Sequence, residues 1–323
     1  MLNVCFVLPS LIAYGEIRVV LEVAKRLRQY NICPSLSANP AYDPPLVDIP
    51  IYDRPLQSTD IVVATSWETV PIALEHEKVG YGLAAWYVQN WEAGWYGVET
   101  NPGIERLACC AEHLRQRIDR EWGIDATVLP SGIDLDEFYL TPHGTCAPRV
   151  SRILIPWRDE AYKNPEGLKE LVYAIKESGR QLVFMSPEMP KDQEFYDEFQ
   201  QWWYVNPFRE DIPWIYGVSD FVVSCSHLEG HSLITLEAIA CGATPIVQEI
   251  GNKETIQGNW GVMLPPEAGV DDYLEAMIVY EEDRCNWSTK RSAGRRFIER
   301  FKWDYVAAQW VMALRSWSSH GEL

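Results

Sequence analysis

The sequence predicts an α/β protein with two domains, each built around a parallel sheet. Its 323 residues are enough for roughly two domains that each bury a core. Short apolar runs typical of buried strands alternate with helical stretches, which favours parallel sheets covered by helices on both faces. The stretch 141–150 (TPHGTCAPRV), with two prolines and a glycine, is typical of a linker. We therefore expect two Rossmann-like domains whose sheets face each other across a ligand-binding cleft.

The first domain is expected to span residues 1–145. Its first helix, near 16–29, shows the 3.6-residue period of an amphipathic helix in Val19, Val20, Val23, Ala24 and Leu27. Further helices are expected near 69–76 and 112–122. The strand candidates in chain order are 3–8, 60–65, 84–89, 106–110 and 126–129.

The second domain is expected to span residues 151–300. Its expected strands are 152–157, 181–186, 220–225 and 260–264. The expected helices are 165–178, an aromatic-rich stretch at 193–204, and a short helix at 211–216. Two or three further helices complete the chain.

The composition argues against several classes of partner. Lys and Arg number 28 against 46 Asp and Glu, a net charge of −18. Nucleic acid as a main partner is disfavoured because its binding requires a basic surface, and an anionic membrane is a poor general partner. No run approaches the ~20 apolar residues of a transmembrane segment, and no signal peptide is expected. The eight cysteines form no C-x-x-C pair, so we expect a reducing compartment: the cytoplasm, either free or peripheral to the membrane.

The most informative stretch is 224–247 (SCSHLEGHSLITLEAIACGATPIV), which predicts a strand, a loop, a helix and another strand. Ser232 is a good N-cap, and Gly242 stands where a left-handed C-cap is wanted. The backbone amides at the start of this helix therefore form a candidate phosphate site, helped by the helix dipole. They belong to Gly230, His231, Ser232 and Leu233.

Two carboxylates, Glu229 and Glu237, flank these amides. Carboxylates accept hydrogen bonds from the hydroxyls of a sugar or a ribose. A site with amides for phosphates and carboxylates for hydroxyls suits a nucleotide sugar. The alternative is an ordinary strand–helix–strand unit with two solvated glutamates.

Glu229 and Glu237 stand in an E-x7-E arrangement, with E-G-H-S-L followed by L-E-A-I-A-C-G. This pattern resembles the donor-site signature of retaining glycosyltransferases of the GT-B fold, family-4-like (group 1). The resemblance implies a nucleoside-diphosphate sugar as co-substrate and transfer that retains the anomeric configuration without a metal. It assigns the transferred sugar to Glu229 and the ribose to Glu237. It also implies a C-terminal helix, 303–320, that crosses back onto the first domain.

A second element of the resemblance is Trp157-Arg158 followed by Lys163-Asn164, which is similar to the family's G-R…K-N element. Two cations near a helix N-terminus would neutralise a leaving diphosphate, Arg158 as a planar fork and Lys163 as a point charge. We expect Arg158, Lys163 and Glu229 to be the catalytic residues. The alternative is a pair of solvated cations.

In the first domain, the loop after the first strand ends at Gly15, which we expect to lie against the donor diphosphate. The family's loop is richer in glycine, and a plain strand-to-helix turn is the alternative. No G-x-G-x-x-G is present, so a dinucleotide site lacks its fingerprint.

The string Y-x-Q-x-x-E at 87–92 is similar to a rhamnosyltransferase-like branch of the family. Gln89 and Glu92 are expected to hold sugar hydroxyls, and Trp91 or Trp95 to stack on an acceptor. The acceptor would be a glycan, a lipid-linked molecule or a small molecule. An aromatic patch that packs between domains is the alternative for the tryptophans.

The segment 129–138 resembles the family's I-P-N-G-V-D…F and contains Asp134-Leu135-Asp136, a D-x-D string. We interpret Asp134 as a turn or cap residue and expect no metal and no cofactor beyond the nucleotide sugar. Three alternatives stay open: a nucleotide-sugar epimerase, a non-catalytic sugar-nucleotide binder, and a DNA glucosyltransferase. A basic run at 284–302 is interpreted as a solvated helix face, with a lipid or polyanion contact as the alternative.

Overall fold

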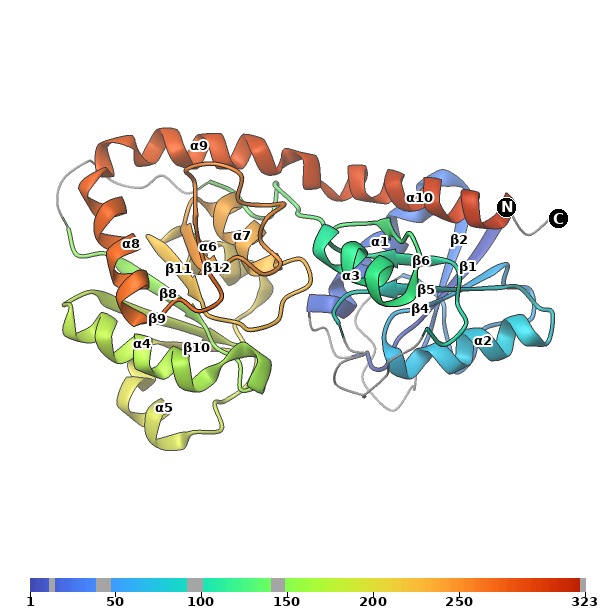
Figure 1. Ribbon diagram of the computed structural model, residues 1–323, viewed down its shortest axis with the longest axis horizontal. Coiled ribbons are helices and arrows are strands. Elements are labelled where there is room, and N and C mark those ends of the chain that lie inside the picture. Colours follow the sequence, from blue (N-terminus) through green and yellow to red (C-terminus); the bar gives the residue numbers. More distant parts are fainter. Residues whose placement is uncertain (12–14, 39–47, 92–100, 141–148, 320–323) are drawn as a thin grey trace. The chain divides into compact units, whose positions relative to one another are not determined.

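The computed structural model describes residues 1–11, 15–38, 48–91, 101–140 and 149–319 (Figure 1). The chain forms two compact units. Unit 1 comprises Met1–Gly132 and Phe301–Leu323, and unit 2 comprises Ile133–Arg300. One has a seven-stranded and the other a six-stranded sheet, and all pairs of neighbouring strands are parallel. The expected α/β architecture of two parallel-sheet domains is confirmed.

The sheet of unit 1 has the strand order β3-β2-β1-β4-β5-β6-β7. Its strands are β1 (Leu2–Val7), β2 (Ile32–Ser37), β3 (Ile51–Tyr52), β4 (Ile61–Ala64), β5 (Leu83–Val88), β6 (Leu107–Cys109) and β7 (Thr127–Val128). Its α-helices are α1 (Gly15–Leu27), α2 (Val70–Lys78), α3 (Glu112–Trp122) and α10 (Trp303–Ser319). The C-terminal helix α10 packs on α1, and its Trp310 ring lies edge-on to Phe6 and Tyr87 at 5.6 and 4.8 Å.

Strand β2 was not expected from the sequence, and it contains a proline, Pro34, in its middle. Proline lacks the amide hydrogen that a strand needs on a side where it pairs. Pro34 faces Val4 of β1, whereas pairing with β3 begins only at Leu36. The proline therefore lies where β2 has a neighbour on one side alone.

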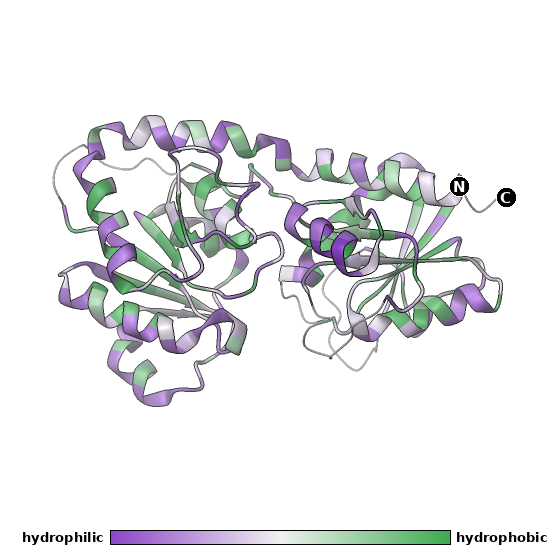
Figure 2. Ribbon diagram, in the orientation of Figure 1, coloured by the Kyte–Doolittle hydropathy of each residue, from purple (hydrophilic) through white to green (hydrophobic). Residues whose placement is uncertain are grey.

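The sheet of unit 2 has the order β10-β9-β8-β11-β12-β13. Its strands are β8 (Arg152–Pro156), β9 (Gln181–Ser186), β10 (Trp203–Val205), β11 (Phe221–Ser224), β12 (Thr244–Gln248) and β13 (Val262–Leu264). Its α-helices are α4 (Pro165–Glu177), α5 (Gln193–Phe199), α6 (Ile212–Gly217), α7 (Leu233–Cys241), α8 (Val270–Glu282) and α9 (Trp287–Ile298). Alternate residues of β8 pack with apolar residues of α4, α5 and α8 in one buried cluster. The central strands of both units are hydrophobic, as Figure 2 shows.

The helix expected over 193–204 is wrong in its second part. Helix α5 ends at Phe199, and Trp203 begins the edge strand β10. The Trp203 ring stacks on Phe184 of the neighbouring strand, with the ring centroids 4.5 Å apart. This long-range contact outweighs the local helical pattern.

The division between the units falls earlier than the expected boundary at 145, because residues from Ile133 onward group with unit 2. Arg295 of α9 donates hydrogen bonds to the carbonyl oxygens of Leu135, Phe138 and Ala240, at 2.7, 2.7 and 2.5 Å. The Phe138 ring also lies against Tyr216. Most of the expected linker, 141–148, lies outside the described residues.

Among the helices that the structure describes, none combines the length and apolar character needed to cross a membrane. The seven cysteines within the described residues are free thiols. Burial raises the pKa of Cys5 to about 11, and a hydrogen bond from Ser35 offsets this only in part. This thiol therefore stays protonated at neutral pH.

Candidate functional site

The order in which strands are added to the sheet of unit 2 reverses at β8. From β8 the chain adds β9 and β10 on one side and then β11, β12 and β13 on the other. Open parallel sheets bind ligands outside the carboxyl ends of the strands at such a switch point. Arg158 and Lys163 follow β8, whereas Glu229 and Gly230 follow β11. The topology therefore brings the sequence-predicted residues of unit 2 to the one edge where a ligand is expected.

Lys163 and Glu229 meet across this switch point. The Lys163 Nζ lies 2.6 Å from Glu229 Oε1, and the two side chains are 18% and 14% exposed. A charge-assisted bond of this kind orients both groups in a partly desolvated place. The pair joins the loop after β8 to the loop after β11.

Arg158 pairs with Glu160 in the same loop, with Nη2 2.7 Å from Oε1. Burial opposes ionisation of Glu160, but the hydrogen bonds and charge of Arg158 outweigh it and lower the pKa of the carboxyl group. Glu160 therefore stays ionised and holds the Arg158 guanidinium at the edge of the sheet.

Helix α7 begins and ends as the sequence predicts. Ser232 is its N-cap, and its Oγ accepts a hydrogen bond from the Thr235 amide at 3.4 Å. Gly242 is the C-cap in the left-handed conformation, with φ of 87°. Glu237 lies in the second turn and is 6% exposed.

A loop after β12 supports the start of α7, and sequence reasoning missed it. Gly251 has φ of 72°, and a Cβ there would lie 2.6 Å from the Cβ of Glu229 and 2.7 Å from the Gly230 carbonyl oxygen. The Gly251 carbonyl also accepts a hydrogen bond from the Ser232 amide at 3.3 Å. The Ser232 amide is thus bonded within the protein, and its place among the phosphate donors stays a prediction.

Asn252 and Thr255 extend this support. The Asn252 Oδ1 accepts a hydrogen bond from Thr235 Oγ1 at 2.6 Å, and its Nδ2 donates to the carbonyls of Gln248 and Ile250 at 2.8 and 2.9 Å. The Nε2 of His231 lies 3.2 Å from Thr255 Oγ1. The Gly251-Asn252 dipeptide, a turn signal, was the sequence feature that could have revealed this loop.

The expected site residues of unit 1 are described only in part. Gly15 is the first residue of α1, and Glu92 and Trp95 lie outside the described residues. Gln89 follows β5 and is 7% exposed. Trp91 is 6% exposed, and its ring lies against the Trp122 ring and under the Arg117 guanidinium at 5.1 and 4.5 Å. Its observed ring contacts are those of core packing, and stacking on an acceptor stays a prediction.

The D-x-D string forms a turn. Asp134 Oδ1 accepts hydrogen bonds from the amides of Asp136 and Glu137 at 2.9 and 3.1 Å. Its interpretation as a turn residue is confirmed, and whether transfer needs a metal stays open to experiment.

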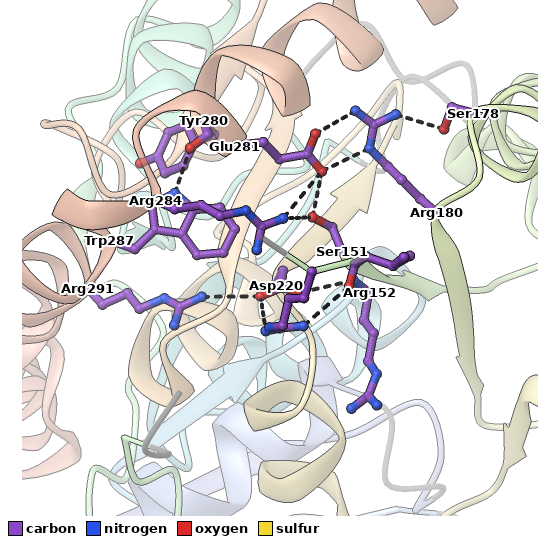
Figure 3. A network of polar contacts seen from close by, with 12 residues as sticks. Ser151, Arg152, Ser178, Arg180, Asp220, Tyr280, Glu281, Arg284, Trp287 and Arg291 are labelled. Atoms are coloured by element: carbon purple, nitrogen blue, oxygen red, sulfur yellow. Dashed lines mark hydrogen bonds and ion pairs between the residues drawn. The ribbon is translucent and has the colours of Figure 1, made fainter. Parts of the chain in front are cut away.

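The basic run is not a solvated helix face throughout. The Arg291 side chain is 7% exposed and lies 3.7 Å from the fully buried carboxylate of Asp220 (Figure 3). Asp220 Oδ1 also accepts a hydrogen bond from Arg149 at 2.6 Å, and Oδ2 accepts one from the Arg152 amide at 3.0 Å. Desolvation lowers the pKa of Arg291 to about 10, and the charge of Asp220 opposes this shift.

A second acidic group, Glu281, completes the network. It accepts hydrogen bonds from Arg180 Nη2 at 2.8 Å and from Ser151 Oγ at 2.5 Å, and Arg284 in turn donates to Ser151 (Figure 3). The network joins the amino ends of β8 and β11 to helices α8 and α9. It lies at the sheet edge opposite to the switch-point residues and serves unit 2 as structure.

Comparisons with known proteins agree with this fold. Residues 158–283 match the family model Glycosyl transferases group 1. This match runs from Arg158 to α8 and covers less than half of the 323 residues. A comparison with curated protein sequences finds no match.

Three similar solved structures cover nearly the whole chain. Sucrose-phosphate synthase from Thermosynechococcus elongatus has a TM-score of 0.77 at 14% identity, covering 99% of this chain and 100% of that one. HepE from Anabaena, in complex with UDP and glucose, has a TM-score of 0.78 at 14% identity, covering 98% and 100%. A glycosyltransferase from Rickettsia africae has a TM-score of 0.73 at 18% identity, covering 98% of each chain. These similarities show that the fold is GT-B.

Proposed function

We propose that this protein is a retaining, metal-independent glycosyltransferase. It moves a sugar from a nucleoside-diphosphate sugar to a glycan, a lipid-linked molecule or a small-molecule acceptor. The observation that carries the proposal is the Lys163–Glu229 pair at the switch point of unit 2, inside the segment that matches group 1 glycosyltransferases. HepE, which has the same fold, has been solved with UDP-glucose, and this supports a nucleotide sugar as donor.

In the proposed reaction, the bond between the anomeric carbon and the diphosphate oxygen breaks while the acceptor oxygen attacks that carbon from the same face, which retains the configuration, and the acceptor proton passes to the departing diphosphate oxygen. Negative charge grows on the departing oxygen, and preorganised donors aimed there lower the barrier. Arg158, Lys163 and the backbone amides at the start of α7 are the proposed donors. Glu229 would orient the transferred sugar, and Glu237 would hold the ribose.

Replacing Glu237 with glutamine tests the ribose contact. The change keeps the shape of the side chain and removes its charge, so donor binding should weaken by about 1–3 kcal/mol. Glu170→Gln, on the exposed face of α4, is the matched control and should leave binding unchanged. Isothermal titration with the nucleoside diphosphate measures the dissociation constants of both variants. An unaltered dissociation constant for Glu237→Gln would contradict the assignment of Glu237 to the ribose.

Product analysis tests the proposed reaction and its metal independence. The protein is incubated with nucleotide sugars, a panel of acceptors and EDTA, and released nucleoside diphosphate is measured. We expect activity to persist in EDTA, and we expect proton NMR of the product to show the anomeric configuration of the donor. Loss of activity in EDTA with rescue by magnesium or manganese would contradict metal independence, and an inverted product would contradict retention. Release without a glycosylated product would instead favour hydrolysis, and isomerised donor would favour the epimerase.

A further inference from the structure

Glu160 lies in the loop after β8, between the two cations that are proposed to receive the leaving diphosphate. Its carboxylate accepts hydrogen bonds from Arg158 Nη2 at 2.7 Å and from Arg158 Nε at 3.2 Å. Its main-chain carbonyl accepts a hydrogen bond from the Lys163 amide at 2.8 Å. One residue thus contacts both cations, Arg158 through its side chain and Lys163 through its main chain.

The carboxylate of Glu160 bonds to one edge of the Arg158 guanidinium, the edge formed by Nε and Nη2. A guanidinium carries five N–H donors in a planar fork, and those of Nη1 lie on a different edge. An arginine can therefore bond to a carboxylate on one edge and to a phosphate oxygen on another. Because two nitrogens of the fork bond to the same carboxylate, the contact also fixes the plane of the guanidinium.

The loop that carries Glu160 is fixed by its neighbour Asp159. The Asp159 Oδ1 accepts a hydrogen bond from Trp157 Nε1, and its Oδ2 accepts one from the Lys191 amide in the loop after β9, both at 3.0 Å. The Trp157 ring is buried and stacks on Phe195, with the ring centroids 4.9 Å apart. Because Asp159 ties the loop to the core of unit 2, the Glu160 carboxylate has a defined place from which to hold Arg158.

The exposure of the pair indicates that it contributes little to the stability of the fold. The side chains of Arg158 and Glu160 are 24% and 40% exposed. Ion pairs that water can reach contribute little to stability. An arginine side chain otherwise samples many rotamers, and this freedom is lost when it binds a ligand. A carboxylate that already orders Arg158 therefore acts on the geometry of the site rather than on the stability of unit 2.

We propose that Glu160 is a positioning residue that orients Arg158 toward the departing diphosphate oxygen. The inference rests on the proposed function and adds a residue that acts on the reaction through Arg158. The negative charge of Glu160 opposes binding of the diphosphate, whereas the ordering of Arg158 favours it, so the two effects offset each other in donor affinity. In the transition state the charge on the departing oxygen is larger, and the orientation of Arg158 has the larger effect. Glu160 therefore acts on turnover more than on donor affinity.

A double-mutant cycle on turnover tests whether Glu160 acts through Arg158. Glu160→Gln keeps the shape of the side chain and removes its charge, and we expect it to lower turnover by about tenfold. The KM for the donor should change by less than about twofold. In the Arg158→Ala background the same substitution should have no further effect on turnover, because the group that Glu160 positions is absent.

Glu198→Gln is the matched control, because Glu198 pairs with Lys176 and its side chain is 37% exposed, close to the 40% of Glu160. This control should leave turnover unchanged in both backgrounds. Equal losses from Glu160→Gln in the two backgrounds, or no loss in either, would overturn the positioning role and leave the proposed function in place. Tighter donor binding with unchanged turnover would also overturn it, since Glu160 would then only compete with the diphosphate for Arg158. An unaltered protein that transfers no sugar from any nucleotide sugar would overturn both proposals.

Discussion

Replacing Arg158 or Lys163 with alanine is expected to lower turnover by about 10²–10³-fold, the effect of removing one donor to a developing oxyanion. The charge on the leaving diphosphate oxygen grows in the transition state, so a cation there acts more on turnover than on donor affinity. Steady-state kinetics with the donor at varied concentration, together with titration of the nucleoside diphosphate, separate the two effects. A rise in KM with turnover intact would show that these residues only help binding.

Two controls keep this result interpretable. Lys176→Ala removes a cation of α4 whose side chain is 52% exposed and pairs with Glu198, and it should leave turnover unchanged. Lys163→Ala leaves the Glu229 carboxylate without its observed cation, so its urea unfolding must be compared with that of the unaltered protein. If Lys163→Ala lowers turnover only because the variant is partly unfolded under the assay conditions, the catalytic role of Lys163 is contradicted.

Replacing Asp220 with asparagine is expected to destabilise unit 2 by about 3–5 kcal/mol, which is typical when one partner of a buried ion pair is removed. The Asp220 side chain is fully buried and accepts hydrogen bonds from Arg149 and from the Arg152 amide. The negative charge of Asp220 also compensates the positive charge of Arg291, whose side chain is 7% exposed. Without the carboxylate, a buried guanidinium loses its compensating charge.

Hydrogen exchange in urea can follow unit 2 separately, which matters because a chain of two units need not unfold in one step. Asp48→Asn is the control, since Asp48 forms an ion pair with Arg28 but its side chain is fully exposed. Exposed pairs contribute about 0–1 kcal/mol, so this change should have little effect. Equal effects of the two substitutions would show that burial does not determine the strength of the Asp220 network.

The parts of the fold that the sequence predicts are those with local causes. The caps Ser232 and Gly242 mark both ends of α7, because each acts on the backbone groups of its own helix. The alternation of strands and helices then predicts the parallel sheets. Glu229 and Lys163 were expected at one site from a resemblance, and the strand order of unit 2 gives the physical reason why they meet.

The parts that the sequence does not predict depend on contacts between distant segments. Trp203 lies in an edge strand because of its stacking on Phe184. The support of α7 by Gly251 follows only once the loop after β12 is placed beside Glu229. Arg291 belongs to a charged run that looks solvated in sequence, and its burial depends on Asp220, which lies far away in the chain.

The most direct test of the central claim, a nucleotide-sugar site at the switch point of unit 2, is a calorimetric titration of the whole protein with UDP-, dTDP-, GDP- and ADP-sugars. We predict saturable binding of at least one donor at a single site. We predict that this binding weakens in Arg158→Ala and Glu237→Gln and is unchanged in Lys176→Ala. Failure of every donor to bind, or equal binding by all three variants, would contradict the account.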